Sequence, residues 1–292
     1  MKQRLAVGTV QFGMQYGIAN NTGMASLETV RDIVAEAQSQ GVCWYDTAPC
    51  YGQSEGILGR LLPNQSQIIT KTHAVASKRI HSTDVAECEC VFQQSLKALR
   101  RSSVYGLMVH ATEDLNKVGS DRLYAWLCRL KARGLVQKIG VSVYTPEQVD
   151  QITAQYDIDL VQFPLSLIDQ RMIAQGHIAK LKAMGIELHV RSVFLQGLLL
   201  MKVADLPEYF SPYRDVIAFL HEQAGHYALT PLQLCLSFVL NIPEIDRVII
   251  GVQTVTQFIE IMRTAHLPLD VAGLRACGDN RSGLIYPTLW QA

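Results

Sequence analysis

Residues 26–47, SLETVRDIVAEAQSQGVCWYDT, contain one unit of the pattern that decides the fold. Apolar residues at positions 27, 30, 33, 34 and 37 recur at the spacing of one helix face, and Ser26 precedes them as a candidate N-cap. Gly41 stands where a helix C-cap is expected, and the apolar run Val42–Thr47 follows it. The segment therefore predicts a helix followed directly by a strand.

The same alternation continues along the whole chain. Further helices are expected at Val85–Arg100, Asp121–Arg133, Thr145–Ala154 and Met172–Met184. Eight short apolar runs are expected to be strands: Arg4–Phe12, Val42–Thr47, Gln67–Thr72, Val104–His110, Lys138–Val143, Leu160–Pro164, Glu187–Val193 and Arg247–Gly251. Strands that alternate with helices and are apolar on both faces predict a parallel sheet that is covered on both sides.

Eight strand–helix units favour a closed (β/α)8 TIM barrel in the α/β class over an open doubly wound sheet. The open sheet would carry a Gly-x-Gly-x-x-Gly turn after its first strand, and Val7-Gly8-Thr9 followed by Gly13 does not have that spacing. We expect residues 1–292 to form a single barrel domain with extra helices at Pro212–His226 and Thr230–Asn241. The tail Leu267–Ala292 is expected to lie over the barrel mouth, where added segments usually shape a ligand site.

Charge and composition exclude several kinds of partner. Lys and Arg together number 26, as do Asp and Glu, so the formal net charge is zero. Nucleic acids and anionic membranes attract a basic surplus, and we expect neither as a partner. No apolar stretch approaches the roughly 18 residues of a membrane span, and the N-terminal apolar run is too short for a secretory signal. These features predict a cytoplasmic protein.

The seven cysteines and eight histidines show no metal-binding pattern. Cys88 and Cys90 are the closest cysteine pair, but residues two apart on a helix point to different sides. No second cysteine pair or histidine doublet completes a zinc site. We expect reduced, mostly buried thiols and no bound metal.

Titratable residues stand at the ends of three consecutive expected strands. Asp46 lies at the end of the second, Lys71 at the end of the third and His110 at the end of the fourth. Tyr51 follows Asp46 by five residues in the next loop. Because the carboxyl ends of barrel strands form the active face, we expect these four side chains to converge.

The loop that contains Tyr51 carries a resemblance to a known family. Residues 44–59, WYDTAPCYGQSEGILG, are similar to the signature loop of the aldo-keto reductase superfamily, and Ile69–Lys71, Leu107–His110 and Gly140–Ser142 follow in that family's order. The similarity continues through Leu160–Gln162, Ser192–Gly197 and Val248–Gly251. It implies an NAD(P)H-dependent enzyme that interconverts an aldehyde or ketone and an alcohol.

The resemblance implies that Tyr51 is the proton donor in reduction and the acceptor in oxidation. A free tyrosine, with a pKa of about 10, is too weak an acid unless a cation lies beside it. Lys71 would supply that charge, Asp46 would hold the ammonium, and His110 would orient the carbonyl oxygen. Taken singly, each residue has a structural explanation, and Asp46 with Lys71 could form a plain salt bridge.

The resemblance also implies residues that bind the nucleotide. Glycines and helix N-termini suit phosphate because their backbone N–H groups are free to donate. The expected set is Gly8, Thr9, Ser142, Gln162, Arg191, Ser192, Leu195, Gly197, Gly251, Gln253, Thr254 and Gln257. We expect NADP(H) to be favoured slightly over NAD(H).

This chain departs from the family pattern at three places. Val143 replaces an Asn that contacts the nicotinamide carboxamide in relatives, and Gln253 with Thr254 replaces the cation that grips the adenosine 2′-phosphate, for which Arg263 is a possible substitute. Arg191 replaces an aromatic that stacks on the nicotinamide, and it could stack there itself or bind an anionic substrate.

Two other functions stay open at this stage. The first is a nicotinamide-nucleotide-binding redox sensor or regulatory subunit with little turnover. The second is a barrel enzyme in which Lys71 acts as a Schiff-base amine. The expected partner is a small carbonyl compound, and the oligomeric state cannot be predicted from the sequence.

Overall fold

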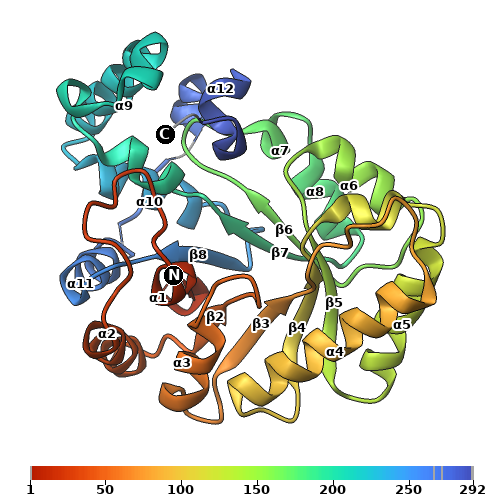
Figure 1. Ribbon diagram of the computed structural model, residues 1–292. Coiled ribbons are helices and arrows are strands. Elements are labelled where there is room, and N and C mark those ends of the chain that lie inside the picture. The colour runs from red at the N-terminus through yellow and green to blue at the C-terminus, as the bar shows by residue number, and fades with distance from the viewer. Residues whose placement is uncertain (1, 266, 271, 291–292) are drawn as a thin grey trace.

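The strands close into a barrel in a computed structural model that describes residues 2–265, 267–270 and 272–290 (Figure 1). Neighbouring strands are parallel, and β1 pairs with both β2 and β8, which completes the ring. The strands are β1 (Leu5–Gly8), β2 (Trp44–Asp46), β3 (Gln67–Lys71), β4 (Val104–Val109), β5 (Val136–Ser142), β6 (Leu160–Pro164), β7 (Glu187–Arg191) and β8 (Arg247–Gly251). The expected TIM barrel and its eight strands are confirmed.

Helices surround the barrel on its outer side (Figure 1). The α-helices are α1 (Val10–Gly13), α2 (Leu27–Ser39), α3 (Ser54–Leu61), α4 (Ser82–Leu99), α5 (Ser120–Ala132), α6 (Pro146–Thr153), α7 (Arg171–Ala174), α8 (His177–Ala183), α9 (Arg214–His226), α10 (Pro231–Leu240), α11 (Val255–Thr264) and α12 (Ser282–Ile285). Short 3₁₀ helices are η1 (Lys2–Arg4), η2 (Thr112–Asn116), η3 (Leu195–Leu200), η4 (Val203–Asp205), η5 (Glu208–Tyr213), η6 (Ala272–Cys277) and η7 (Pro287–Leu289).

Local sequence signals account for where several helices begin. The Ser26 side chain accepts a hydrogen bond from the backbone N–H of Thr29 at the start of α2, as the sequence predicts. Capping boxes with Thr at the N-cap and Gln three residues later begin α6 and α10. Each box satisfies backbone donors that the first helical turn leaves free.

The alternation of side chains along each strand positions the site. Residues two apart share one face of a strand, so the face of β2 that carries Asp46 also carries Trp44. By the same rule Ile69 shares a face with Lys71. A small apolar cluster of Ile69, Met108 and Leu160 is separate from the main core, which joins the strands to the helices. It fills the barrel interior below the polar residues at the strand ends.

A polar network lies toward the amino-terminal end of the barrel. Glu187 at the start of β7 is 2.7 Å from His189 Nε2, accepts a hydrogen bond from Tyr105 and lies 3.1 Å from the Lys138 ammonium. His189 is fully buried. Burial raises the pKa of the Glu187 carboxyl, but these partners outweigh it and lower the pKa to about 2. The network therefore holds a charged carboxylate inside the barrel.

Three details differ from the sequence expectation. The first strand ends at Gly8, and the apolar residues that follow form α1. The helix expected over Met172–Met184 is broken into α7 and α8 because Gly176 adopts a φ of +74°, in the left-handed region. Helix α3 was not predicted, since two glycines weaken its helical pattern.

The described part of the tail packs at the carboxyl end of the barrel beside α7 (Figure 1). The Asp279 backbone N–H donates to Ile168 O at 2.7 Å, and Arg171 donates to the Tyr286 hydroxyl. Positions 1, 271 and 291–292 of the expected domain and tail lie outside the described residues, as does position 266. Within the described ranges, no helix has the length and apolar character needed to cross a membrane.

Candidate active site

A buried ion pair lies at the carboxyl ends of β2 and β3. The Lys71 ammonium is 2.6 Å from Asp46 Oδ1, and the two side chains are 1% and 7% exposed. Lys71 also donates to Thr47 O at 2.9 Å, while Gln162 Nε2 donates to Asp46 Oδ2 at 2.8 Å. The carboxylate is thus held from β3 and β6 together, and the ammonium has a fixed position.

Tyr51 is placed over this pair by the loop between β2 and α3. The Lys71 ammonium lies 4.9 Å from the centre of the Tyr51 ring. The loop rests directly on α1: a Cβ at Gly13 would lie 1.8 Å from Tyr51 O, and a Cβ at Gly52 would lie 2.3 Å from Gly13 O. Gly52 also has a φ of +57°, which favours glycine. Backbone contact therefore determines the position of Tyr51.

Burial and charge act in opposite directions on Tyr51 and Lys71. Burial raises the pKa of the Tyr51 phenol, and the Lys71 charge works against it without overcoming it. Burial would lower the pKa of Lys71, but Asp46 and Tyr51 outweigh it and raise that pKa. At neutral pH the phenol is therefore protonated and the ammonium is charged.

His110 completes the cluster from the end of β4. Its ring centre is 6.1 Å from that of Tyr51, with the two rings nearly perpendicular. Burial, followed by the Lys71 charge, lowers the pKa of His110 to about 4. The Cys50 thiol lies 3.6 Å from His110 Nδ1. The imidazole is neutral at physiological pH and has a hydrogen-bonding neighbour on one nitrogen.

A cavity of about 560 Å³ opens at the carboxyl ends of the strands. Asp46, Tyr51 and His110 line it, and Lys71 lies behind them. Ten of the expected nucleotide-binding residues also line it: Gly8, Thr9, Ser142, Gln162, Arg191, Ser192, Gly197, Gly251, Gln253 and Gln257. Most of the expected catalytic and nucleotide-binding residues therefore line one cavity.

Two residues of the expected set do not line the cavity. Leu195 is fully buried, and its backbone N–H donates to Ser192 O at 2.9 Å. The Thr254 side chain accepts a hydrogen bond from the Gln257 backbone N–H and so caps α11. Arg263, the possible substitute cation, is exposed on α11 and does not line the cavity either.

The loop after β7 has an unusual backbone. Ser192, Leu195 and Gln196 have φ values of +64°, +43° and +55°, in a region that residues other than glycine seldom adopt. Such strained conformations are concentrated at ligand sites. Within this loop, the Leu195 and Gly197 backbone N–H groups already donate to Ser192 O and Phe194 O, each at 2.9 Å. Ser192, Gln196 and Gly197 of this loop line the cavity.

Part of the cavity wall was missed by the sequence analysis. Lining residues that belong to no recognised motif include Gln11, Asn20, Met201, Leu232 and Glu260. Helical spacing could have identified Glu260, which follows Gln257 by three residues on α11 and so shares its face. The others lie in irregular segments or on added helices whose position depends on tertiary packing.

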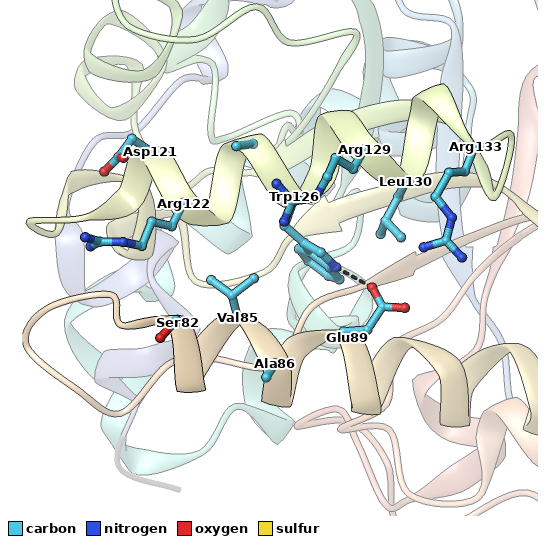
Figure 2. A pocket seen from close by; sticks show the side chains of 11 residues that line it. Ser82, Val85, Ala86, Glu89, Asp121, Arg122, Trp126, Arg129, Leu130 and Arg133 are labelled. Atoms are coloured by element: carbon cyan, nitrogen blue, oxygen red, sulfur yellow. Dashed lines mark hydrogen bonds between the residues drawn. The ribbon is translucent and has the colours of Figure 1, made fainter.

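A second hollow of about 550 Å³ lies on the outside of the barrel between α4 and α5. Figure 2 shows Trp126 and Glu89 facing each other across it, and Trp126 Nε1 donates to Glu89 Oε2 at 2.6 Å. None of the strand-end residues described above lines it. In the described parts of the chain, no group of three or more His, Cys, Asp or Glu residues is arranged to hold a metal.

A closed barrel with titratable groups gathered at the carboxyl ends of its strands defines the class of (β/α)8-barrel enzymes. The model of the Aldo/keto reductase family matches residues 4–277. The chain therefore belongs to the aldo/keto reductase family, as the resemblance predicted. The family takes its name from oxidoreductases that act on aldehydes and ketones.

Individual relatives agree with this assignment. The chain is 28% identical over 180 residues to the aldo-keto reductase YhdN of Bacillus subtilis (strain 168), an alignment covering 58% of this chain and 52% of YhdN. The match therefore spans about half the length of that curated relative.

Solved structures show the same fold. Aldo-keto reductase AKR11C1 from Bacillus halodurans, in its holo form, matches with a TM-score of 0.77 at 18% identity, covering 98% of this chain and 94% of that one. Glycerol dehydrogenase AKR11B4 from Gluconobacter oxydans matches with a TM-score of 0.72 at 20% identity, covering 94% and 90%.

Proposed function

We propose that the protein is an NAD(P)H-dependent enzyme that interconverts an aldehyde or ketone and an alcohol, with Tyr51 as the proton donor and acceptor. The observation that carries the proposal is the position of Tyr51 at the wall of the cavity, with its ring 4.9 Å from the buried Lys71 ammonium. We further propose that the barrel, its added helices and the tail, residues 1–292, form one domain.

Each residue of the cluster has a definite task in this proposal. Tyr51 holds a proton on its phenol oxygen and releases it to the carbonyl oxygen as that oxygen becomes an alkoxide. The Lys71 charge stabilises the phenolate left behind, because it lies close by and is buried, where charges interact more strongly than in bulk water. Asp46 holds Lys71 in place through the 2.6 Å ion pair.

His110 acts as a neutral hydrogen-bond donor. Its pKa of about 4 keeps it uncharged, so it does not compete with Lys71 for the developing negative charge. With Nδ1 turned to Cys50, Nε2 is the nitrogen available to the carbonyl oxygen. The imidazole thereby fixes the carbonyl next to the phenol.

The cavity has the donor set that a nicotinamide nucleotide needs, and when bound the nucleotide supplies the hydride. Ser142 and Gln162 present an alcohol and a primary amide in the cavity wall, which suit a carboxamide. The loop after β7, which lines the cavity with Ser192, Gln196 and Gly197, is the segment that we assign to the pyrophosphate. Gln253 and Gln257 at the start of α11 suit the adenosine.

The lining on α11 supports NAD(H) over NADP(H), which revises the preference expected from the sequence. Glu260 lines the cavity there, while Arg263 does not. A carboxylate repels a 2′-phosphate but can accept a hydrogen bond from a 2′-hydroxyl. Glu260→Lys should therefore tighten NADPH binding and weaken NADH binding in fluorescence titrations, and an unchanged ratio of the two Kd values would refute this preference.

The test of the main proposal is turnover of an aldehyde panel by the wild-type protein and by Tyr51→Phe. Loss of a general acid typically costs on the order of 10²–10⁴ in kcat, while the Kd for NADH should not change. Tyr124→Phe, on α5 outside the barrel, is the matched control and should retain full activity. A Tyr51→Phe protein that turns over normally rules out the proton-donor role.

The same measurements address the other two functions. Tight nucleotide binding without turnover would favour a redox sensor or regulatory subunit. A Schiff base requires a neutral amine, whereas the Asp46 pair raises the pKa of Lys71 and keeps it protonated. Borohydride trapping with an aldehyde should therefore produce no covalent adduct at Lys71.

A further inference from the structure

Arg191 is the only lysine or arginine among the described residues that line the active-site cavity. It is the last residue of β7, and it shares the inward face of that strand with His189. Its side chain is half-buried, and it lines the cavity together with Tyr51 and His110. The charge is thus fixed near the proposed reacting groups.

The contacts of the Arg191 guanidinium position it without neutralising it. The group stacks over the Tyr144 ring at 4.3 Å from its centre. It donates to Val143 O and to Ser192 Oγ, each at 3.3 Å, which are long bonds to neutral acceptors. No carboxylate of the described residues lies within ion-pair distance of it. Since a guanidinium has five N–H donors, several remain for a ligand.

The other charges at the cavity do not balance Arg191. The Asp46 carboxylate is already paired with Lys71 and bonded to Gln162. Glu260 belongs to α11, at the part of the cavity lined by Gln253 and Gln257. The end of the cavity lined by Tyr51 and His110, the proposed reacting end, therefore carries one positive charge without a partner.

That charge acts on the proposed reacting end. Burial has the largest effect on the pKa of Tyr16 and of His110, raising the first and lowering the second. The Arg191 charge lowers both pKa values. Arg191 is therefore close enough to these two residues for its charge to act on a substrate bound between them.

We infer that the substrate is an aldehyde or ketone that carries a carboxylate, and that Arg191 binds this carboxylate. The inference rests on the proposed function and adds the substrate class to it. A planar guanidinium matches a carboxylate with two parallel hydrogen bonds, and stacking on Tyr144 holds its plane in a fixed orientation. A partly buried cation without a counter-ion is costly alone, and an anionic substrate would remove that cost.

The experiment compares two probes that differ in charge. 4-Carboxybenzaldehyde and methyl 4-formylbenzoate share the ring and the carbonyl, and only the first is anionic. The wild-type protein should have the higher kcat/KM with the acid. Arg191→Gln should lower kcat/KM for the acid on the order of ten- to a hundredfold, mainly by raising KM. For the ester, kcat/KM should change less than about threefold.

Two further variants make the comparison specific. Arg191→Lys keeps the positive charge but lacks the planar guanidinium that forms two parallel hydrogen bonds. It should therefore retain part of the preference for the acid over the ester. Arg263→Gln, which removes an exposed arginine outside the cavity, should behave as wild type. Circular dichroism and Tm verify that each variant is folded, and the Kd for NADH should be the same in all of them.

Three outcomes would overturn the inference. An equal loss of activity on the acid and the ester, or a Kd for NADH weakened tenfold in Arg191→Gln, would assign Arg191 to the nucleotide. If neither aldehyde is turned over, the aldehyde panel described above decides on the proposed function, and calorimetric binding of the two probes decides on the role of Arg191. Tighter binding of the acid that is lost in Arg191→Gln supports the inference, and equal binding of acid and ester overturns it.

Discussion

The contact between the two glycine backbones beneath Tyr51 leads to a quantitative prediction for Gly13→Ala. A Cβ at this position would lie 1.8 Å from Tyr51 O and 2.6 Å from Ser54 N, whereas ordinary contact begins at 3.4 Å. The atoms that it meets are backbone, so no side chain can rotate away. The loop must then retreat by up to about 1.6 Å, and we expect Tyr51 to shift by about 1 Å.

A shift of that size at a reacting group costs on the order of 10² in rate. We therefore expect Gly13→Ala to lose about a hundredfold in kcat for aldehyde reduction while it still binds NADH. The assay is steady-state oxidation of NADH with an aldehyde that the wild-type protein reduces, after circular dichroism and Tm establish that the variant is folded.

Gly56→Ala is the matched control. Gly56 lies on α3, three residues beyond Gln53, and a Cβ there meets nothing within 4 Å. Alanine is the better helix former by about 1 kcal/mol, so this variant should be as active as wild type and no less stable. A folded Gly13→Ala protein with kcat within threefold of wild type would refute the idea that backbone contact positions Tyr51.

Three other predictions concern the barrel network, the Cys50 thiol and a helix cap. Glu187 has a folded pKa of about 2, below the ordinary 4.5, so its stabilisation is present above pH 4.5 and is lost as the pH falls toward 2. Glu187→Gln should lower the free energy of unfolding in urea by about 2 kcal/mol at pH 7. The difference in unfolding free energy between the variant and wild type should narrow below about pH 4.5. A difference that does not change with pH would contradict the role of the Glu187 charge. Cys50→Ala should lower kcat severalfold and alter the ¹⁵N chemical shifts of the His110 ring, because Nδ1 loses its hydrogen-bonding partner. Cys50→Ser should restore both kcat and the chemical shifts. Identical ring shifts in wild type and both variants would exclude the contact between Cys50 and His110. Thr230→Ala should lower the free energy of unfolding by about 1 kcal/mol through loss of the α10 capping box, with activity unchanged, and equal denaturation midpoints would argue against the cap.

Much of the fold can be predicted because strand and helix periods differ clearly along the chain. All eight strands were expected, and α2 starts at its expected cap, Ser26. The exceptions depend on single residues. An apolar run past Gly8 looks like strand but turns into α1, and Gly176 divides a helical pattern through its left-handed backbone.

The site was predictable where it stands at strand ends and not where it depends on packing. Asp46, Lys71 and His110 each follow an apolar run, so the barrel rule was enough to bring them together. The contact between Gly13 and the Tyr51 loop joins segments distant in sequence, and no local pattern encodes it. The same is true of cavity residues on the irregular loops, such as Asn20.

The hydrogen bond between Gln162 and Asp46 has a consequence for folding kinetics. It joins residues 116 positions apart, and Gln162 also accepts from Ser142 while Asp46 holds Lys71. Strands from the first half of the chain are thereby tied to strands from the second across the barrel interior. Contacts of such long sequence separation are slow to form, since closing the long segment between them costs chain entropy. During refolding, the return of activity should therefore report the moment when the two halves close.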